Sequence, residues 1–307
     1  MKKSHFFIFV FLLLLSVGTV SGQGYTFRVL ANKGTNQIKK AGTSQGLPLK
    51  TGATLNIGDE LIVGADAYIG LMHSSGKTLE VRATGSQKVA DLEKQVAAKN
   101  TSVASKYAQF IASKMNEDGS TSVSSRMNAT GAVSRAVGDA DIIVLLPDMS
   151  VDVLGNSAII EWEPAKDVTD YTVTVQNIFE DVIFTDETSA TSIDLNFDEM
   201  ETENGLYLVT VSKKGDAGFS SKKFGLKKVS SDDRADLISN YEGLKSEVSE
   251  DSPLSKLIYA SFFEENGLFL DAFTKYQEAM RMSPEVPDFK ILYDAFMLNY
   301  GMMKAEE

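Results

Sequence analysis

The sequence predicts a multidomain, mainly β protein made of a small β-module, an antiparallel β-sandwich and a C-terminal α-helical hairpin. Residues 55–81 alternate apolar with polar or small side chains between glycine-containing turns, a pattern typical of short strands. The same alternation returns over residues 141–229 in seven segments. From residue 231 onward, apolar side chains recur every three or four residues, as they do on one face of a helix.

The first 22 residues are typical of a secretory signal peptide. Lys2 and Lys3 precede an apolar run over residues 6–17, and small residues follow up to Gly22. The run is shorter than the ~20 residues that a membrane-spanning helix needs. We therefore expect cleavage of residues 1–22, no transmembrane span after cleavage, and export to the periplasm or the cell exterior. An uncleaved membrane anchor is the alternative.

The composition of the chain indicates which classes of partner it can bind. The chain has 307 residues, enough for two or three domains, and contains no cysteine, which excludes disulfides and thiol catalysis. Without residues 1–22 it carries 28 basic and 42 acidic residues, a net charge of −14. Because this charge repels phosphate backbones and anionic membranes, we expect protein partners and no nucleic acid.

Residues 25–90 form the expected β-module. Gly58 and Asp59 precede an apolar pair, a glycine, alternating apolar residues, a glycine turn and a last apolar strand; the members of this pattern are Gly58, Asp59, Leu61, Ile62, Gly64, Ile69, Leu71, Gly76, Leu79 and Val81. The pattern resembles the FecR-like periplasmic domain. It departs from that family at the hairpin turn, where His73 and two serines replace the usual Asp-Gly. The resemblance implies a periplasmic β-fold.

Residues 91–135 are expected to be a helical connector followed by a linker. Apolar residues between Asp91 and Met115 follow the three- and four-residue steps of an amphipathic helix, with an interruption near Asn100. Residues 116–128 are rich in Ser, Thr and Gly, which is typical of linkers.

Residues 141–229 predict the sandwich, and we expect its strands at 141–146, 157–162, 170–178, 181–186, 192–197, 205–215 and 221–229. Trp162 ends an early strand, Tyr171 opens the next, and Tyr207 stands where a strand-corner tyrosine is expected. These features resemble the fibronectin type III and other immunoglobulin-like modules. We interpret Trp162 as a core residue between two sheets, with an exposed ligand platform as the alternative, and we interpret Tyr171 and Tyr207 in the same way.

A concentration of lysines stands out in the acidic chain: Lys213, Lys214, Lys222, Lys223, Lys227 and Lys228. They predict either a docking face for an anionic partner or a protected strand edge, since lysines on outer strands prevent edge-to-edge pairing. The candidate partner-binding residues among them are Lys213, Lys214, Lys222 and Lys223.

Residues 232–303 predict helices. Ser252 and Pro253 suit a helix cap and first helical position. Residues 253–286 resemble a tetratricopeptide repeat through Ala260, Phe263, Asn266, Gly267, Ala272, Tyr276, Ala279 and Pro284, but the consensus Trp and Gly of the first helix are absent. One repeat cannot bury a continuous core, so we expect the tail to pack on the sandwich or on a partner. Tyr276 and Met280 are the candidate binding residues here; a role in the helical core is the alternative for the methionines.

No motif predicts catalysis, a cofactor or a metal. Residues 42–46 match the nucleophile-elbow pattern, yet a strand-to-helix turn is not predicted there. His73 is the only histidine after residue 22. We therefore expect a non-enzymatic binding or scaffolding protein of the bacterial cell envelope. Two alternatives stay open: a FecR-like signalling protein for an outer-membrane receptor, and an exported glycan-acting enzyme with an accessory sandwich.

Overall fold

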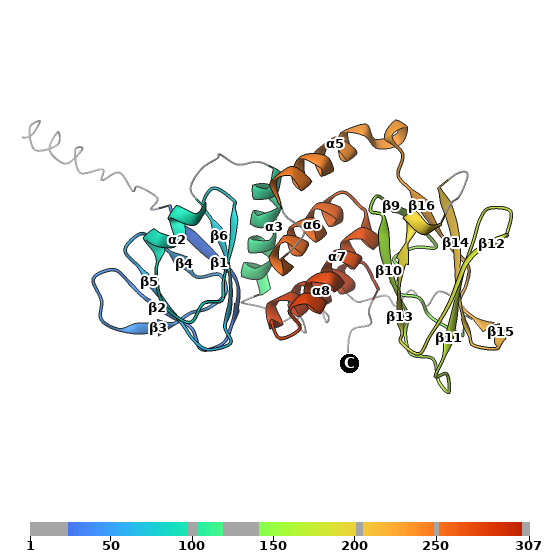
Figure 1. Cartoon of the computed structure of the whole chain (residues 1–307), viewed down its shortest axis with the longest axis horizontal. Helices are drawn as coiled ribbons and strands as arrows, with labels where there is room; N and C mark the ends of the chain where they lie inside the picture. The colour runs from blue at the N-terminus through green and yellow to red at the C-terminus, as the bar shows by residue number, and fades with distance from the viewer. Residues whose placement is uncertain (1–23, 97–102, 119–140, 201–204, 249–251, 303–307) are drawn as a thin grey trace, which may run out of the picture.

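The computed structural model places a β-module at one end of the molecule, a β-sandwich at the other end and a layer of helices between them (Figure 1). It describes residues 24–96, 103–118, 141–200, 205–248 and 252–302. The expected signal peptide, the predicted break near Asn100 and the linker beyond residue 118 lie outside the described residues. The C-terminal helices therefore occupy the middle of the molecule, although they come last in the sequence.

The β-module contains two four-stranded sheets, in the strand orders β4-β1-β6-β7 and β3-β2-β5-β8. Its strands are β1 (Phe27–Lys33), β2 (Gln37–Lys39), β3 (Gly46–Pro48), β4 (Thr54–Leu55), β5 (Glu60–Val63), β6 (Tyr68–His73), β7 (Thr78–Val81) and β8 (Gly85–Lys88). Leu61 and Val63 are buried while Ile62 is exposed, because successive side chains of a strand point to opposite faces. The expected short strands and tight turns are confirmed.

Asp59 explains why a Gly-Asp pair opens this pattern. Gly58 takes a φ of 95°, which favours glycine, and the buried Asp59 carboxylate accepts hydrogen bonds from the backbone N–H groups of Asn56 and Ala41. The Lys40 ammonium lies 2.9 Å from it. Burial raises the pKa of Asp59, but these hydrogen bonds and Lys40 outweigh it and lower the pKa below its usual value.

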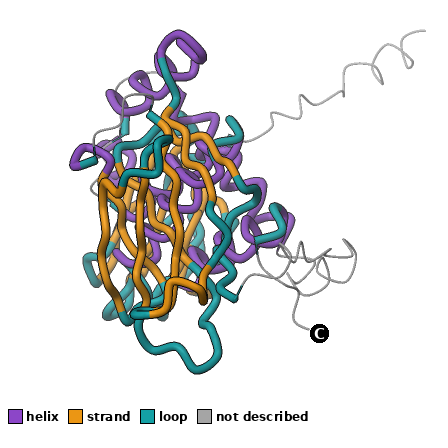
Figure 2. The backbone as a smooth tube through the Cα atoms, turned by 90° about the vertical axis from the view of Figure 1, so that its right-hand side faces the viewer, coloured by secondary structure: helices purple, strands orange, loops and turns teal. Residues whose placement is uncertain are grey.

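The sandwich has one large and one small sheet, in the orders β12-β11-β14-β16-β9 and β10-β13, with β15 paired to β14. Its strands are β9 (Ser150–Val153), β10 (Ser157–Glu161), β11 (Tyr171–Gln176), β12 (Val182–Thr188), β13 (Ser192–Asn196), β14 (Leu206–Lys213), β15 (Asp216–Ser220) and β16 (Phe224–Lys228), with a 3-10 turn, η1 (Phe197–Glu199). Figure 2, seen from this end, shows the strands in front of the helices. Six of the seven expected strands are confirmed.

The strand expected at residues 141–146 is wrong. This segment contributes only an isolated bridge between Val144 and Trp162, and the additional strand β9 follows it. The segment is apolar without alternation and ends before Pro147, so it packs as an irregular cover rather than as one face of a sheet. The expectation of a fully antiparallel sandwich is also wrong, because β9 pairs with β16 in parallel.

Six helices accompany the sheets in the described residues: α2 (Val89–Val96), α3 (Val103–Asp118), α5 (Ser231–Glu247), α6 (Pro253–Glu265), α7 (Phe269–Met282) and α8 (Pro287–Asn299). The cap of α6 is confirmed, since the Ser252 hydroxyl accepts a hydrogen bond from the Ser255 N–H and Pro253 occupies the first turn. Helices α6 and α7 form the expected hairpin. Helix α5 is kinked at Arg234, whose backbone is not helical.

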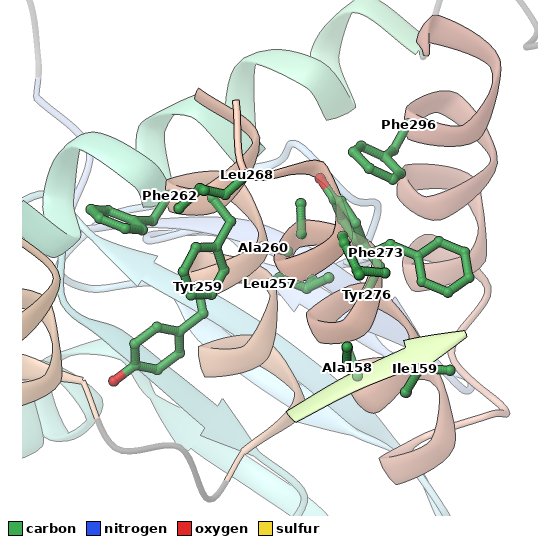
Figure 3. Close-up of a cluster of buried hydrophobic side chains, with 14 of the residues drawn as sticks. Ala158, Ile159, Leu257, Tyr259, Ala260, Phe262, Leu268, Phe273, Tyr276 and Phe296 are labelled. Carbon is green, nitrogen blue, oxygen red and sulfur yellow. The ribbon is translucent and has the colours of Figure 1, made fainter. Parts of the chain in front are cut away.

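One hydrophobic core runs from the helices into the sandwich and also reaches the outer face of the β-module. Figure 3 shows Ala158 and Ile159 of β10 beside Leu257, Phe273 and Tyr276 of the helices. The β-module keeps a second core of its own, formed between its two sheets. The tail therefore packs on the sandwich, as one of the two expectations had it.

Candidate binding cleft

A polar stripe on helix α7 attaches the helices to the sandwich. Asp271, Thr274, Gln277 and Arg281 recur every three or four residues, so they share one face of the helix. Thr274 accepts a hydrogen bond from the Ile159 N–H at 3.0 Å. Asp271 accepts hydrogen bonds from the N–H groups of Leu154 and Gly155, in the turn before β10. Gln277 donates to the Glu161 carboxylate at the end of β10, and Arg281 donates to the Asp194 carboxylate of β13.

Asp271 is the buried carboxylate of this stripe, with 2% of its surface exposed. Its carboxylate oxygens accept hydrogen bonds from the N–H groups of Leu154 at 2.9 Å and Gly155 at 2.7 Å. Burial raises the pKa of Asp271 to about 6, although these two hydrogen bonds and the nearby Lys228 oppose the shift. Lys228 itself donates to the carbonyl oxygens of the same turn. The turn between β9 and β10 is thus held from both sides.

The opposite side of the helical layer is attached to the β-module by fewer bonds. Asp288, at the start of α8, accepts from the Asn32 N–H at 2.9 Å and the Thr51 hydroxyl at 3.1 Å. Glu80 accepts from the Tyr68 hydroxyl and from the Leu254 N–H at the start of α6. The helices therefore have fixed positions relative to both β parts.

Within the helical layer, a buried polar cluster joins four helices at Glu264. Its carboxylate lies 2.5 Å from the Lys114 ammonium of α3 and accepts a hydrogen bond from the Tyr276 hydroxyl of α7 at 2.9 Å. Burial and the charge of Glu264 raise the pKa of Tyr300, after α8, to about 12. The Lys114, Glu264 and Tyr276 side chains of this cluster bind one another inside the protein.

The main cleft lies between the sandwich and the helices and has a volume of about 630 Å³, within the range of roughly 300–1,000 Å³ common for binding sites. One wall is β9 with the segment before it, and the other wall is the α6–α7 turn together with the end of α8. The lining residues are Pro147, Asp148, Ser150, Val151, Asp152, Gly267, Phe269, Asn299, Tyr300 and Gly301.

Strand β9 borders this cleft with an open edge. It is the last strand of its sheet, and the carbonyl groups of Met149 and Val153 accept hydrogen bonds from the β16 side. Because backbone groups alternate along a strand, those of Ser150, Asp152 and Leu154 point the other way. Asp271 binds the Leu154 N–H, whereas the backbone groups of Ser150 and Asp152 bind no other described residue.

The charges and rings of the cleft are arranged around this edge. Asp148 and Asp152 are exposed, and the Arg234 guanidinium lies 3.9 Å from the Asp152 carboxylate. Arg234 also donates to the Asn266 carbonyl at 2.9 Å, which ties the kink of α5 to the end of α6. On the helical wall the rings of Phe269 and Tyr300 pack with centroids 4.3 Å apart.

A second cleft of about 430 Å³ lies between α5, α7 and the β9–β10 turn. Its lining combines Glu242, Lys245 and Lys275 with the Asp271 carboxylate, whose oxygens already bind the turn. Its charged groups are of both signs, and it contains no open strand edge.

The four candidate lysines lie on the sandwich and not in either cleft. Lys214 pairs with Glu187 at 2.5 Å and Lys223 with Glu180 at 2.8 Å, while the Lys213 ammonium lies 5.9 Å from the Phe219 ring centroid. Lys222 is exposed in the loop before β16. The expectation that these lysines belong to outer strands is wrong, because Lys213 lies in β14, an interior strand of the sheet, and Lys214, Lys222 and Lys223 lie in a turn and a loop.

The two candidate residues of the tail lie in its core region. Tyr276 is only 1% exposed and donates its hydroxyl to Glu264, so its assignment to a binding surface is wrong. Met280 is half-buried against the same core, in agreement with the alternative that methionines fill gaps there. The open edge of β9 was missed by the sequence reasoning. The alternation of Ser150, Val151, Asp152 and Val153 after Pro147 was the available signal.

The residues considered for catalysis do not converge. Nδ1 of His73 lies 2.7 Å from the Ser75 hydroxyl of its own turn, and burial lowers the pKa of His73. In the described ranges, no three His, Asp or Glu side chains are close enough to hold a metal ion. Among the same residues, none of the helices combines the length and the apolar composition needed to cross a bilayer.

A scan against protein-family models and a search of curated proteins gave no match to this chain.

Proposed function

We propose that this chain is a non-enzymatic binding or scaffolding protein of the bacterial cell envelope. The observation that carries the proposal is the cleft beside β9, where an open strand edge, two carboxylates and an aromatic pair face one space between rigidly joined walls. Groups of this kind recognise a chain by its backbone and side chains. They include no nucleophile paired with a base.

We further propose that the three parts are a FecR-like module, an immunoglobulin-like sandwich and a tetratricopeptide-like hairpin. The Tyr207 hydroxyl donates to the Met200 carbonyl seven residues upstream, as a strand-corner tyrosine does in immunoglobulin-like folds. Ala260, Ala272 and Ala279 are fully buried where α6 and α7 pack, which supports a tetratricopeptide-like hairpin. All three module types commonly mediate contacts between proteins.

The proposed location can be tested directly by N-terminal sequencing of the protein purified from an envelope fraction. A start near Gln23 supports export with cleavage after residue 22. An intact Met1 in the membrane fraction would instead indicate an anchored protein and favour the signalling alternative.

The proposed binding function is tested by placing a photo-reactive amino acid at Asn299, on the helical wall of the cleft, in cells that express the full chain. We expect a covalent adduct of defined mass with another envelope protein. The same probe at Lys166, an exposed residue outside the cleft lining, is the control and should give no such adduct. Absence of an adduct at Asn299, or release of reducing ends from a glycan panel by the wild-type chain but not by an Asp or Glu to Ala variant, would contradict the proposal.

A further inference from the structure

The open edge of β9 defines the kind of chain that the cleft can accept. An extended segment lying beside Ser150 and Asp152 would form hydrogen bonds with the N–H and carbonyl groups of these two residues, which bind no other described residue. Backbone pairing of this type gives affinity without sequence preference, and the side chains then supply specificity. Just beyond β9 on the same edge, and outside the lining of the cleft, the Leu154 N–H already donates to the Asp271 carboxylate.

The side chains of β9 indicate which residues the added strand should carry. Ser150 and Asp152 are exposed on one face of the sheet, while Val151 and Val153 are buried on the other. Residues directly opposite each other on neighbouring strands point to the same face. A residue opposite Asp152 therefore lies on the same face as its carboxylate, which the Arg234 guanidinium approaches only to 3.9 Å. Asp148 adds a second carboxylate to the cleft lining, so a Lys or Arg side chain is favoured there and an acidic one is repelled.

The alternate residues of the added strand point to the buried side of the sheet. The apolar groups that line the cleft include the ring pair of Phe269 and Tyr300. These rings favour aliphatic or aromatic side chains over polar ones. The net charge of the chain, −12, additionally attracts basic segments at long range.

We infer that the cleft binds an extended basic segment of a partner protein, in which Lys or Arg alternates with apolar residues, by adding it as a strand to the free edge of β9. This inference rests on the proposed binding function and names the chemistry of the partner. In the free protein β9 is the last of five strands in the order β12-β11-β14-β16-β9. In the complex the bound segment would be a sixth strand, and β9 would become an interior strand.

The test measures binding of a short fluorescent peptide of alternating lysine and valine to the full chain. A second peptide has the same side chains but N-methyl groups on alternate residues, which removes the N–H groups needed for strand pairing and keeps the charge. We expect at least tenfold weaker binding of the methylated peptide. Equal binding of the two peptides would overturn strand addition and leave only charge attraction.

Two protein variants locate the binding at β9. Ser150→Pro removes an N–H from the free edge while leaving the bonds to β16, because Pro is tolerated on strand edges where the N–H faces outward. We expect it to weaken binding at least tenfold, and Asp152→Asn to weaken it severalfold with a smaller dependence on salt. The control Asp186→Asn, on the opposite edge strand β12, should bind like wild type. Thermal unfolding of each variant verifies that it is folded.

Separate outcomes distinguish this inference from the proposed function. If the Asn299 probe captures an envelope protein but wild type and Ser150→Pro bind the peptide equally, the binding function stands and the strand-addition inference fails. If wild type forms dimers that Ser150→Pro abolishes, a second copy occupies the edge and the inference of a basic partner segment is overturned.

Discussion

Tyr207 fixes the corner where the chain passes from the small sheet to the large sheet. Its ring packs on Phe197, with centroids 4.9 Å apart, and its hydroxyl donates to the Met200 carbonyl at 3.1 Å. The substitution Tyr207→Phe keeps the ring but leaves this carbonyl without its donor. We expect the free energy of unfolding to fall by about 1–2 kcal/mol, measured by urea denaturation. Tyr25→Phe is the control, because the Tyr25 hydroxyl makes no hydrogen bond to the described residues; an equal loss in both variants would refute the role of the hydroxyl.

Asp271 predicts a pH dependence of stability. Its pKa is about 6 in the folded protein against a usual value of 3.8, so the folded state binds the proton more tightly than the unfolded state. Its contribution to stability is therefore fully present below about pH 3.8 and is lost as the pH rises through 6. The variant Asp271→Asn has no such titration.

We expect the stability of wild type minus that of Asp271→Asn to be larger at pH 4 than at pH 7, by on the order of 2–3 kcal/mol. Denaturation series at several pH values measure this difference. Asp186→Asn, at an exposed carboxylate, should show almost none of it. A difference that grows with rising pH would contradict the assignment of Asp271 as a carboxyl group with a raised pKa.

The burial of a single residue could be predicted from the sequence where its side chain fits only one environment. Trp162, Tyr171 and Tyr207 were expected in the core, and all three are buried. Asp271 and Glu264 were not singled out, because a carboxylate on a helix is usually solvated. The N–H groups that donate hydrogen bonds to the Asp271 carboxylate belong to Leu154 and Gly155, more than a hundred residues away, and nothing in the local sequence indicates this pairing.

At the scale of elements, two ion pairs between α3 and α6 make a matched comparison. Lys114 and Glu264 are 15% and 3% exposed, whereas Lys106, which pairs with the neighbouring Glu265, is 65% exposed. Lys114→Met leaves a buried carboxylate without its cation and should lower the free energy of unfolding by roughly 3 kcal/mol. Lys106→Met should lower it by less than about 1 kcal/mol. Similar losses in the two variants would show that burial does not decide the strength of these pairs.

Elements with a clear period were predictable, and those that depend on distant partners were not. The alternation in β11, β13 and β14 and the cap of α6 are local signals, and the structure contains these elements as expected. The apolar segment at 141–146 has no alternation, so its sequence fits a buried strand and an irregular cover equally well. The parallel strand β9 has four residues and a partner far along the chain, which leaves only a weak local pattern.

At the scale of the whole molecule, the helices after residue 229 complete the core of the sandwich. Ala158 and Ile159 of β10 are buried with Phe273 and Tyr276 of α7 in one continuous cluster. A chain that ends at Val229 would expose this apolar surface. We expect it to lose the cooperative thermal unfolding of the sandwich, whereas the β-module has a separate core. Scanning calorimetry of both chains measures this, and an unchanged sandwich transition in the shortened chain would show that the helices are dispensable.

The order of the parts along the chain was predictable, but their arrangement in space was not. Periodicity reports which face of an element is apolar and not which partner covers it. Hence the position of the helices between the two β parts, and the cleft that forms there, follow from contacts such as those of Asp288 and Arg281 with distant strands. The lysine surface was selected from composition alone, and ion pairs within the sandwich already use Lys214 and Lys223.

The proposed binding of a partner segment requires that the free edge of β9 is the binding surface. Amide hydrogen exchange of the full chain, with and without the alternating lysine and valine peptide at saturation, tests this residue by residue. We predict slower exchange at the Ser150 and Asp152 amides and no change at Asp186 and Glu187 on the opposite edge strand. Unchanged exchange at Ser150 and Asp152 while the peptide is bound would contradict the account.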